Sequence, residues 1–139
     1  MRLVDASVFV HAFLRPKRKL QHHERRIKES AKSIVRRINE GEEVAMTVVQ
    51  LAEVANLLET HLPREMAAQV EEFLVRAPNV SLLAVDRRAC SEALTVSIEH
   101  EVGLSDAIAY VVMLSQGIRE IYSFDRDFDR LPGIVRLTE

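Results

Sequence analysis

The chain is short of cysteine, of glycine and of long apolar runs, and each shortage excludes a class of protein. The single cysteine, Cys90, has no partner for an internal disulfide and rules out a cysteine-rich zinc site. The four glycines form no dinucleotide-binding fingerprint and no P-loop, and the sequence has no Gly-x-Ser-x-Gly nucleophile elbow. No apolar stretch approaches the roughly 20 residues of a membrane helix, and Asp5 interrupts the place where a signal peptide would need apolar residues. These absences favour a protein of the reducing cytoplasm.

The overall composition is that of a soluble globular protein. The chain has 139 residues, of which 47% are hydrophobic and 29% charged, which is enough to bury a core without disulfides. The histidines show no zinc-protease spacing; they are His11, His22, His23, His61 and His100. We therefore expect a single domain over residues 1–139.

Charge is distributed unevenly along the chain. Residues 15–37, which we call the basic segment, contain ten lysines and arginines against two glutamates, so they carry +8 while the whole chain carries −2. Such an excess of one sign is typical of polyanion binding, although a solvated helix face is an alternative. The candidate polyanion-binding residues are Arg15, Lys17, Arg18, Lys19, Arg25, Arg26, Arg36 and Arg37.

Short apolar runs alternate with helical periodicity. Apolar runs predict strands at 2–4, 44–46, 80–85, 121–124 and 134–137. Apolar residues at helical spacing predict helices over 24–39, 47–59 and 63–78, one capped by Asp86, and one that Ser105 caps and Gly117 closes. Strands that alternate with helices predict an α/β fold with a largely parallel sheet flanked by helices.

Four carboxylates lie at the ends of these runs or close to them: Asp5, Glu53, Asp106 and Asp125. Asp5 and Asp125 follow predicted strands, and in open α/β sheets ligands bind beyond the carboxyl ends of the strands. Four acids gathered there would repel one another and lose solvation, and divalent cations relieve both costs. Their placement is compatible with one metal site.

Each acid also has an ordinary structural explanation. Asp106 suits the first turn of a helix, Glu53 suits an exposed helix face, and Asp125 suits a turn. Asp5 is hardest to explain in this way, because an aspartate directly after a buried strand has little structural purpose. The four together favour the metal-site interpretation.

Four motifs in this order resemble those of the PIN-domain nucleases, and most of all the VapC-type toxin ribonucleases. They are Asp5-Ala6-Ser7, Leu51-Ala52-Glu53-Val54, Leu104-Ser105-Asp106-Ala107, and Ser123-Phe124-Asp125-Arg126-Asp127-Phe128 followed by Leu131-Pro132-Gly133-Ile134. The resemblance spans essentially the whole chain. It implies a three-layer α/β/α sandwich that acts as a metal-dependent endoribonuclease, the toxin of a toxin–antitoxin pair.

The resemblance also implies roles for individual residues. Asp5, Glu53, Asp106 and Asp125 would be the catalytic acids and hold Mg²⁺ or Mn²⁺, with Ser7 and Ser123 as polar support. Asp127 is an alternative fourth ligand. Phe128 is expected to fold into the core and leave Asp129 near solvent. The family's products imply RNA ends with a 5′-phosphate and a 3′-hydroxyl.

The expected partners are RNA, a cognate antitoxin and a second copy of the chain in a homodimer. The basic segment would bind RNA phosphates or an acidic segment of the antitoxin. The main alternative function is a noncatalytic RNA-binding or protein-interaction module on the same fold. A receiver domain fits less well because it needs paired acids near the first strand, and a haloacid-dehalogenase-like phosphatase needs a second aspartate where Ser7 stands.

Overall fold

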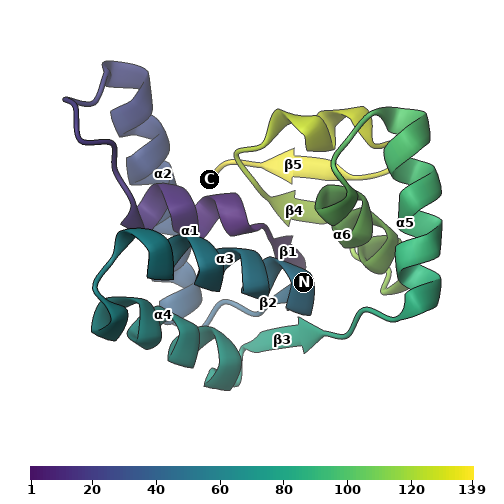
Figure 1. Ribbon diagram of the computed structural model, residues 1–139, viewed down its shortest axis with the longest axis horizontal. Coiled ribbons are helices and arrows are strands. Elements are labelled where there is room, and N and C mark those ends of the chain that lie inside the picture. The colour runs from purple at the N-terminus through teal and green to yellow at the C-terminus, as the bar shows by residue number, and fades with distance from the viewer.

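The computed structural model describes all 139 residues and has a fully parallel, five-stranded sheet at its centre (Figure 1). The strand order is β3-β2-β1-β4-β5, so β1 occupies the middle position. The strands are β1 (Arg2–Val4), β2 (Val44–Thr47), β3 (Val80–Leu83), β4 (Glu120–Tyr122) and β5 (Val135–Leu137). The α/β class and the parallel sheet are therefore confirmed.

Six α-helices and one short 3₁₀-helix connect the strands. They are α1 (Ala6–Phe13), α2 (His22–Asn39), α3 (Val48–His61), α4 (Arg64–Arg76), α5 (Arg87–His100), α6 (Leu104–Ser115) and the 3₁₀-helix η1 (Arg126–Arg130). None of them combines the length and the apolar composition needed to cross a bilayer.

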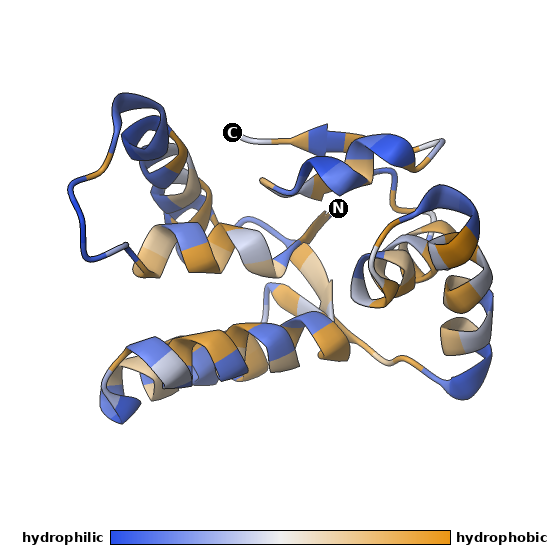
Figure 2. Ribbon diagram, turned by 45° about the horizontal axis from the view of Figure 1, so that its top comes forward, coloured by the Kyte–Doolittle hydropathy of each residue, from blue (hydrophilic) through white to orange (hydrophobic).

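The sheet separates two hydrophobic cores, because successive side chains of a strand point to opposite faces. In β1, Leu3 packs with α5 and α6, whereas the next residue, Val4, packs with α1 to α4. Ile121 and Tyr122 of β4 divide in the same way. Figure 1 shows the two groups of helices on either side of the strands, and in Figure 2 several helices carry apolar residues along one side and polar residues along the other. The α/β/α layering is thus confirmed.

Two local predictions were wrong. Ser105 does not cap α6; the cap is Gly103, and Ser105 lies in the first turn. The strand predicted over 80–85 ends at Leu83, and of its residues only Val80 is buried. The reason is its position: β3 is an edge strand, so its side chains are less covered than those of the central strands.

Candidate metal centre

Asp5 lies at the carboxyl end of the central strand and also caps α1. The residue is 5% exposed, and its carboxylate accepts three hydrogen bonds. Gln50 Nε2 donates to Oδ1 at 3.3 Å, while Ser123 Oγ at 2.9 Å and the Ser7 N–H at 3.3 Å donate to Oδ2. These donors, from three separate parts of the chain, fix the orientation of the carboxylate.

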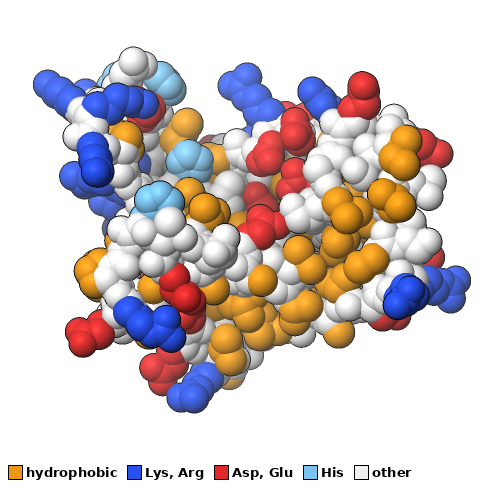
Figure 3. Space-filling view, viewed as in Figure 1, with side chains coloured by type: hydrophobic (Ala, Val, Ile, Leu, Met, Phe, Trp, Pro, Cys, Tyr) orange, Lys and Arg blue, Asp and Glu red, His pale blue; other side chains and the backbone are white.

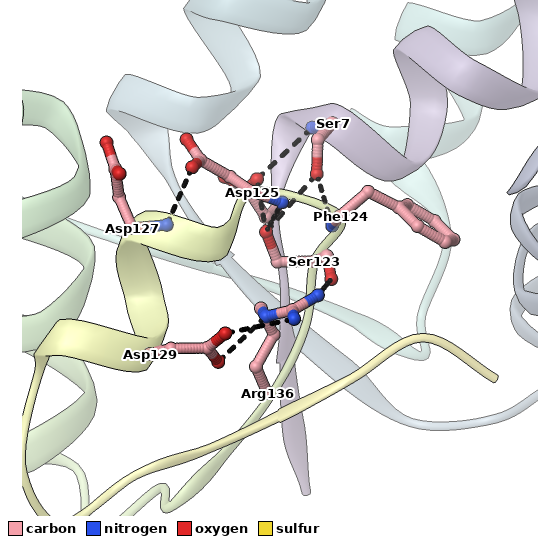
Figure 4. A network of polar contacts seen from close by, with 8 residues as sticks. Ser7, Ser123, Phe124, Asp125, Asp127, Asp129 and Arg136 are labelled. Carbon is pink, nitrogen blue, oxygen red and sulfur yellow. Dashed lines mark hydrogen bonds and ion pairs between the residues drawn. The ribbon is translucent and has the colours of Figure 1, made fainter. Parts of the chain in front are cut away.

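Ser7 and Ser123 connect this carboxylate to the segment after β4 (Figure 4). Their hydroxyl oxygens are 3.3 Å apart. Ser7 Oγ accepts the Phe124 N–H at 3.0 Å, and Ser123 Oγ accepts the Asp125 N–H at 3.0 Å. The two serines therefore position the backbone that carries Asp125 relative to Asp5.

Asp125 begins η1 and accepts the Asp127 N–H on Oδ1 at 2.9 Å. Carboxylate oxygens of Asp106, Asp125 and Asp127 all lie within 4.8 Å of one another. Phe128, next in the chain, is 1% exposed and belongs to the core, as predicted. Burial of this ring anchors η1 against the fold, so the two aspartates on either side of Arg126 are held near Asp106.

Asp106 shows how strongly the acids interact. It lies in the first turn of α6, where a helix dipole would favour its charge. Burial nevertheless raises the pKa of Asp106 to about 8, with further contributions from the charges of Asp5 and Asp125, a hydrogen bond with Asp125, and the charge of Glu53. Without a cation, a proton is therefore the favoured occupant of this carboxylate near neutral pH.

Glu53 completes the group from α3. It is half-buried, and this burial raises its pKa; a hydrogen bond from Ser105 opposes the shift, and the charges of Asp5 and Asp125 add to it. The charges of the same two aspartates, Asp5 and Asp125, thus raise the pKa values of both Glu53 and Asp106. The structure brings all four sequence-predicted acids to one edge of the sheet, together with Asp127.

Asp129 lies outside this cluster, exposed as predicted. It pairs with Arg136, whose Nε and Nη2 donate to the two carboxylate oxygens at 2.9 and 3.1 Å. The guanidinium lowers the pKa of Asp129, the opposite direction from Asp106. Nη1 of the same arginine donates to the Ser123 carbonyl at 3.2 Å, so this pair braces the serine from the far side (Figure 4).

The sequence interpretation missed Gln50 and Arg136. Gln50 is 1% exposed and forms a capping box with Thr47, in which its Oε1 accepts the Thr47 N–H at 3.0 Å. That leaves its amide N–H free to donate to Asp5. The Thr-x-x-Gln signature before an apolar run was visible in the sequence, but it predicts only a helix start. Nothing in the sequence indicates the contact with Asp5.

The basic segment comprises the α1–α2 loop and most of α2, and the structure divides its charges. Arg18 makes a two-point ion pair with Glu24 at 2.8 Å, and Arg37 contacts Glu42 at 3.4 Å and the Tyr122 hydroxyl. Other members are exposed and have no acidic partner: Arg15, Lys17, Lys19, Arg25, Arg26 and Arg36. Figure 3 shows Lys and Arg gathered at the upper left, over the end of α2, and acidic side chains near the middle.

The donor set fits Mg²⁺ or Mn²⁺. Every candidate ligand is a carboxylate oxygen, which these hard cations prefer, and no histidine or cysteine belongs to the cluster. Burial, and after it the charges of neighbouring acids, raises the pKa values of Asp106 and Glu53, so their ionised forms need compensation that the protein's own groups do not supply. A divalent cation would supply that compensation.

Several solved structures share this fold. VapC20 of Mycobacterium tuberculosis, a toxin that cleaves the sarcin–ricin loop, is 20% identical, with a TM-score of 0.72 over 96% of this chain and 97% of that one. A toxin–antitoxin complex from Klebsiella pneumoniae is 14% identical, with a TM-score of 0.70 over 100% and 98%. FitAcB from Neisseria gonorrhoeae is 16% identical, with a TM-score of 0.64 over 99% and 98%. At these identities the likeness establishes the fold.

No curated protein sequence matches the chain significantly. The profile of the PIN domain, however, matches residues 2–134, nearly the whole length. That match agrees with the parallel sheet and with the acids at its carboxyl edge. The chain belongs to the PIN-domain family.

Proposed function

We propose that the protein is a divalent-cation-dependent endoribonuclease and the toxin of a toxin–antitoxin pair. One observation carries the proposal: acids from four separate elements meet at the carboxyl edge of the sheet, where burial, together with the charges of the neighbouring acids, raises the pKa of Asp106 to about 8. An arrangement this costly to the free protein is typical of a site built for a ligand. The structural likeness to VapC20, described as a toxin that cleaves the sarcin–ricin loop, suggests RNA as the substrate.

Asp5, Glu53, Asp106 and Asp125 would hold Mg²⁺ or Mn²⁺, with Asp127 as a fifth contributor. A bound ion of this kind lowers the pKa of a coordinated water and stabilises charge on a phosphate. The chain's own part is orientation. Gln50, Ser7 and Ser123 fix both oxygens of Asp5, and the Ser123 hydroxyl also sets the backbone of Asp125. Preorganised carboxylates need little reordering when a ligand binds. The proposed products carry a 5′-phosphate and a 3′-hydroxyl.

The proposed partners are a cognate antitoxin and a second copy of the chain. The structure from Klebsiella pneumoniae is described as a toxin–antitoxin complex, which suggests an antitoxin for this chain. For the homodimer, the support is a group of exposed apolar side chains at the α5–α6 corner. Leu94, Ile98 and Leu104 are 52%, 71% and 44% exposed. Pairing of two such faces would remove apolar surface from water.

Cleavage of labelled structured RNA tests the catalytic proposal. The wild-type protein should cut in Mn²⁺ and not in chelator, and Asp5→Asn should abolish cleavage. Asp125→Asn should do the same and Asp127→Asn should weaken it, because both carboxylates lie within the cluster. Asp129→Asn is the matched control, since Asp129 lies outside the cluster and the asparagine keeps an amide oxygen that can still accept a hydrogen bond from Arg136.

Two results would contradict the proposal. Cleavage that persists in all three cluster variants would mean that other groups perform the reaction. RNA binding without any Mn²⁺-dependent cleavage would instead favour the noncatalytic module on the same fold. If Asp127→Asn is inactive while Asp125→Asn is fully active, the fourth ligand is Asp127.

A further inference from the structure

The loop between α1 and α2 and the first half of α2 enclose a strongly basic pocket. Its volume is about 380 Å³, and only one of its lining residues is hydrophobic and one acidic. Six basic residues line it: Arg15, Arg18, Lys19, Arg25, Lys28 and Lys32. Figure 3 shows this basic region at one end of the molecule, with histidine side chains between it and the acidic side chains.

Only some of these charges are free to bind a ligand. Arg18 is neutralised by Glu24, and the Lys28 ammonium donates to the His11, Ala12 and Leu14 carbonyls, each at 3.2 Å. Lys28 therefore ties α2 to the end of α1 and forms a fixed wall. Arg15, Lys19 and Arg25 have no acidic partner. The pocket thus presents three cations without acidic partners, two from the loop and one from α2, beside the wall formed by Lys28.

A second pocket adjoins the basic pocket. It has a volume of about 250 Å³, shares Arg15, Leu20 and Lys28 with the basic pocket, and is also lined by His11. The His11 ring meets the Phe124 ring edge to face, with centroids 5.4 Å apart and planes at 71°. Phe124 stands between Ser123 and Asp125, and Figure 4 shows its ring turned away from the acids. The second pocket is therefore connected, through His11 and Phe124, to the chain segment that carries Asp125.

His11 is suited to contact a nucleobase. It remains exposed despite the contact with Phe124, so ring surface is available to a ligand. Burial and the charge of Lys28 lower the pKa of His11, which keeps the ring neutral at pH 7. Its partner is fixed, because the Phe124 N–H donates to Ser7 Oγ at 3.0 Å. A base stacked here would lie directly beside the segment that carries Asp125.

We propose that this path is the binding track for a single RNA strand, with backbone phosphates held by Arg15, Lys19 and Arg25 and one base stacked at His11 beside Phe124. The inference deepens the proposed function and rests on RNA being the substrate. An acidic peptide would use the cations but not the exposed ring of His11. A single RNA strand would use both, since single-strand sites combine a basic groove with aromatic stacking. The C-terminal part of the basic segment, including Arg36, lies outside the track.

Binding to a fluorescein-labelled oligouridylate in chelator tests the track without any cleavage. Arg15→Glu combined with Arg25→Glu should weaken binding about tenfold or more and should reduce the slope of log affinity against log salt by about 1.4, at roughly 0.7 per phosphate contact. Arg36→Glu is the control: it reverses one charge on α2, the helix that also carries Arg25, but lies outside both pockets, so binding and slope should be unchanged. Thermal melts of each variant separate lost binding from lost folding.

His11 has its own pair of variants. His11→Ala should weaken oligouridylate binding about fivefold or more, as removal of a stacking residue does, whereas His11→Phe should retain it because it keeps an aromatic face. An abasic oligonucleotide should not distinguish wild type from His11→Ala.

Two results would overturn the track. Equal effects of Arg36→Glu and the Arg15/Arg25 variant would show a diffuse charge effect. Tight binding of polyglutamate with no binding of oligouridylate would assign the pocket to an acidic protein partner. Because cleavage is measured separately, a protein that cuts RNA but ignores these variants would refute the track and leave the proposed function standing.

Discussion

Asp106→Asn should stabilise the protein when divalent cations are absent and remove the stabilisation that cations give. Burial and the surrounding acids raise the pKa of Asp106 from its ordinary 3.8 to about 8. At roughly 1.36 kcal/mol per pKa unit, ionising this group at pH 7 costs the folded state about 4 kcal/mol. Because water entry and small side-chain movements relieve part of this cost, we expect a measured gain of about 1–3 kcal/mol.

The assay is thermal unfolding in chelator, compared between wild type and variant. A chain of 139 residues gains roughly 2.1 cal/mol/K of entropy per residue on unfolding, so each kcal/mol shifts Tm by about 3–4 °C. The variant should therefore melt about 3–10 °C higher at pH 7. Glu99→Gln is the control: it removes one negative charge from an exposed position on α5 that makes no ion pair, and its Tm should match that of wild type.

The dependence on pH has a definite sign. The folded pKa lies above the unfolded value, so Asp106 contributes stability that is fully present below about pH 4 and is lost as the pH rises through about 8. The advantage of Asp106→Asn should accordingly be absent near pH 4, grow with pH, and level off above about 8.

Added Mn²⁺ should reverse the order of the two melting temperatures, so that wild type melts above Asp106→Asn. Wild type gains stability by mass action when the ion binds the native state, whereas the variant lacks one ligand and gains less. If Asp106→Asn and wild type have the same Tm in chelator at every pH, burial and the surrounding acids do not raise the pKa of Asp106 as the structure indicates. If Mn²⁺ stabilises neither protein, the cluster is not a cation site.

Much of the fold could be predicted, because the spacing of apolar residues along the chain indicates which residues are buried and therefore which segments are helices and strands. Leu3 and Val4 point to opposite cores, and an uninterrupted apolar run is what a strand covered on both faces requires. The convergence of Asp5 and Asp125 follows from the same rule, since parallel strands end at a common edge. By contrast, Ser105 was predicted to cap α6 because serine is preferred at that position, whereas the N-cap in the structure is Gly103. Preference does not reveal that the Ser105 hydroxyl is engaged by Glu53.

The electrostatics of the site could not be predicted, because they depend on distances between side chains from separate elements. Counting charges gave the basic segment +8, but it did not show that Arg18 is paired or that Lys28 is buried against the end of α1. Equally, the sequence shows Gln50 as a capping residue and not as a donor to Asp5. Contacts of this kind arise only when the folded elements meet.

Two further substitutions address the dimer and the positioning of the acids. Ile98→Glu places a charge in the exposed apolar group on α5 and should convert a homodimer into monomers in size-exclusion chromatography with light scattering; an unchanged mass would refute this interface. Ser123→Ala removes the hydroxyl that donates to Asp5 at 2.9 Å and accepts the Asp125 N–H at 3.0 Å. The fold should survive with a loss of about 1–3 kcal/mol, because one buried N–H loses its acceptor. Cation affinity and cleavage should fall about 10–100-fold, since groups that orient ligands have effects of this size. Ser97→Ala, which removes a hydroxyl bonded to the Val102 carbonyl at 2.6 Å away from the site, should reduce stability alone. If Ser123→Ala likewise reduces only stability, Ser123 supports the fold and does not orient the acids.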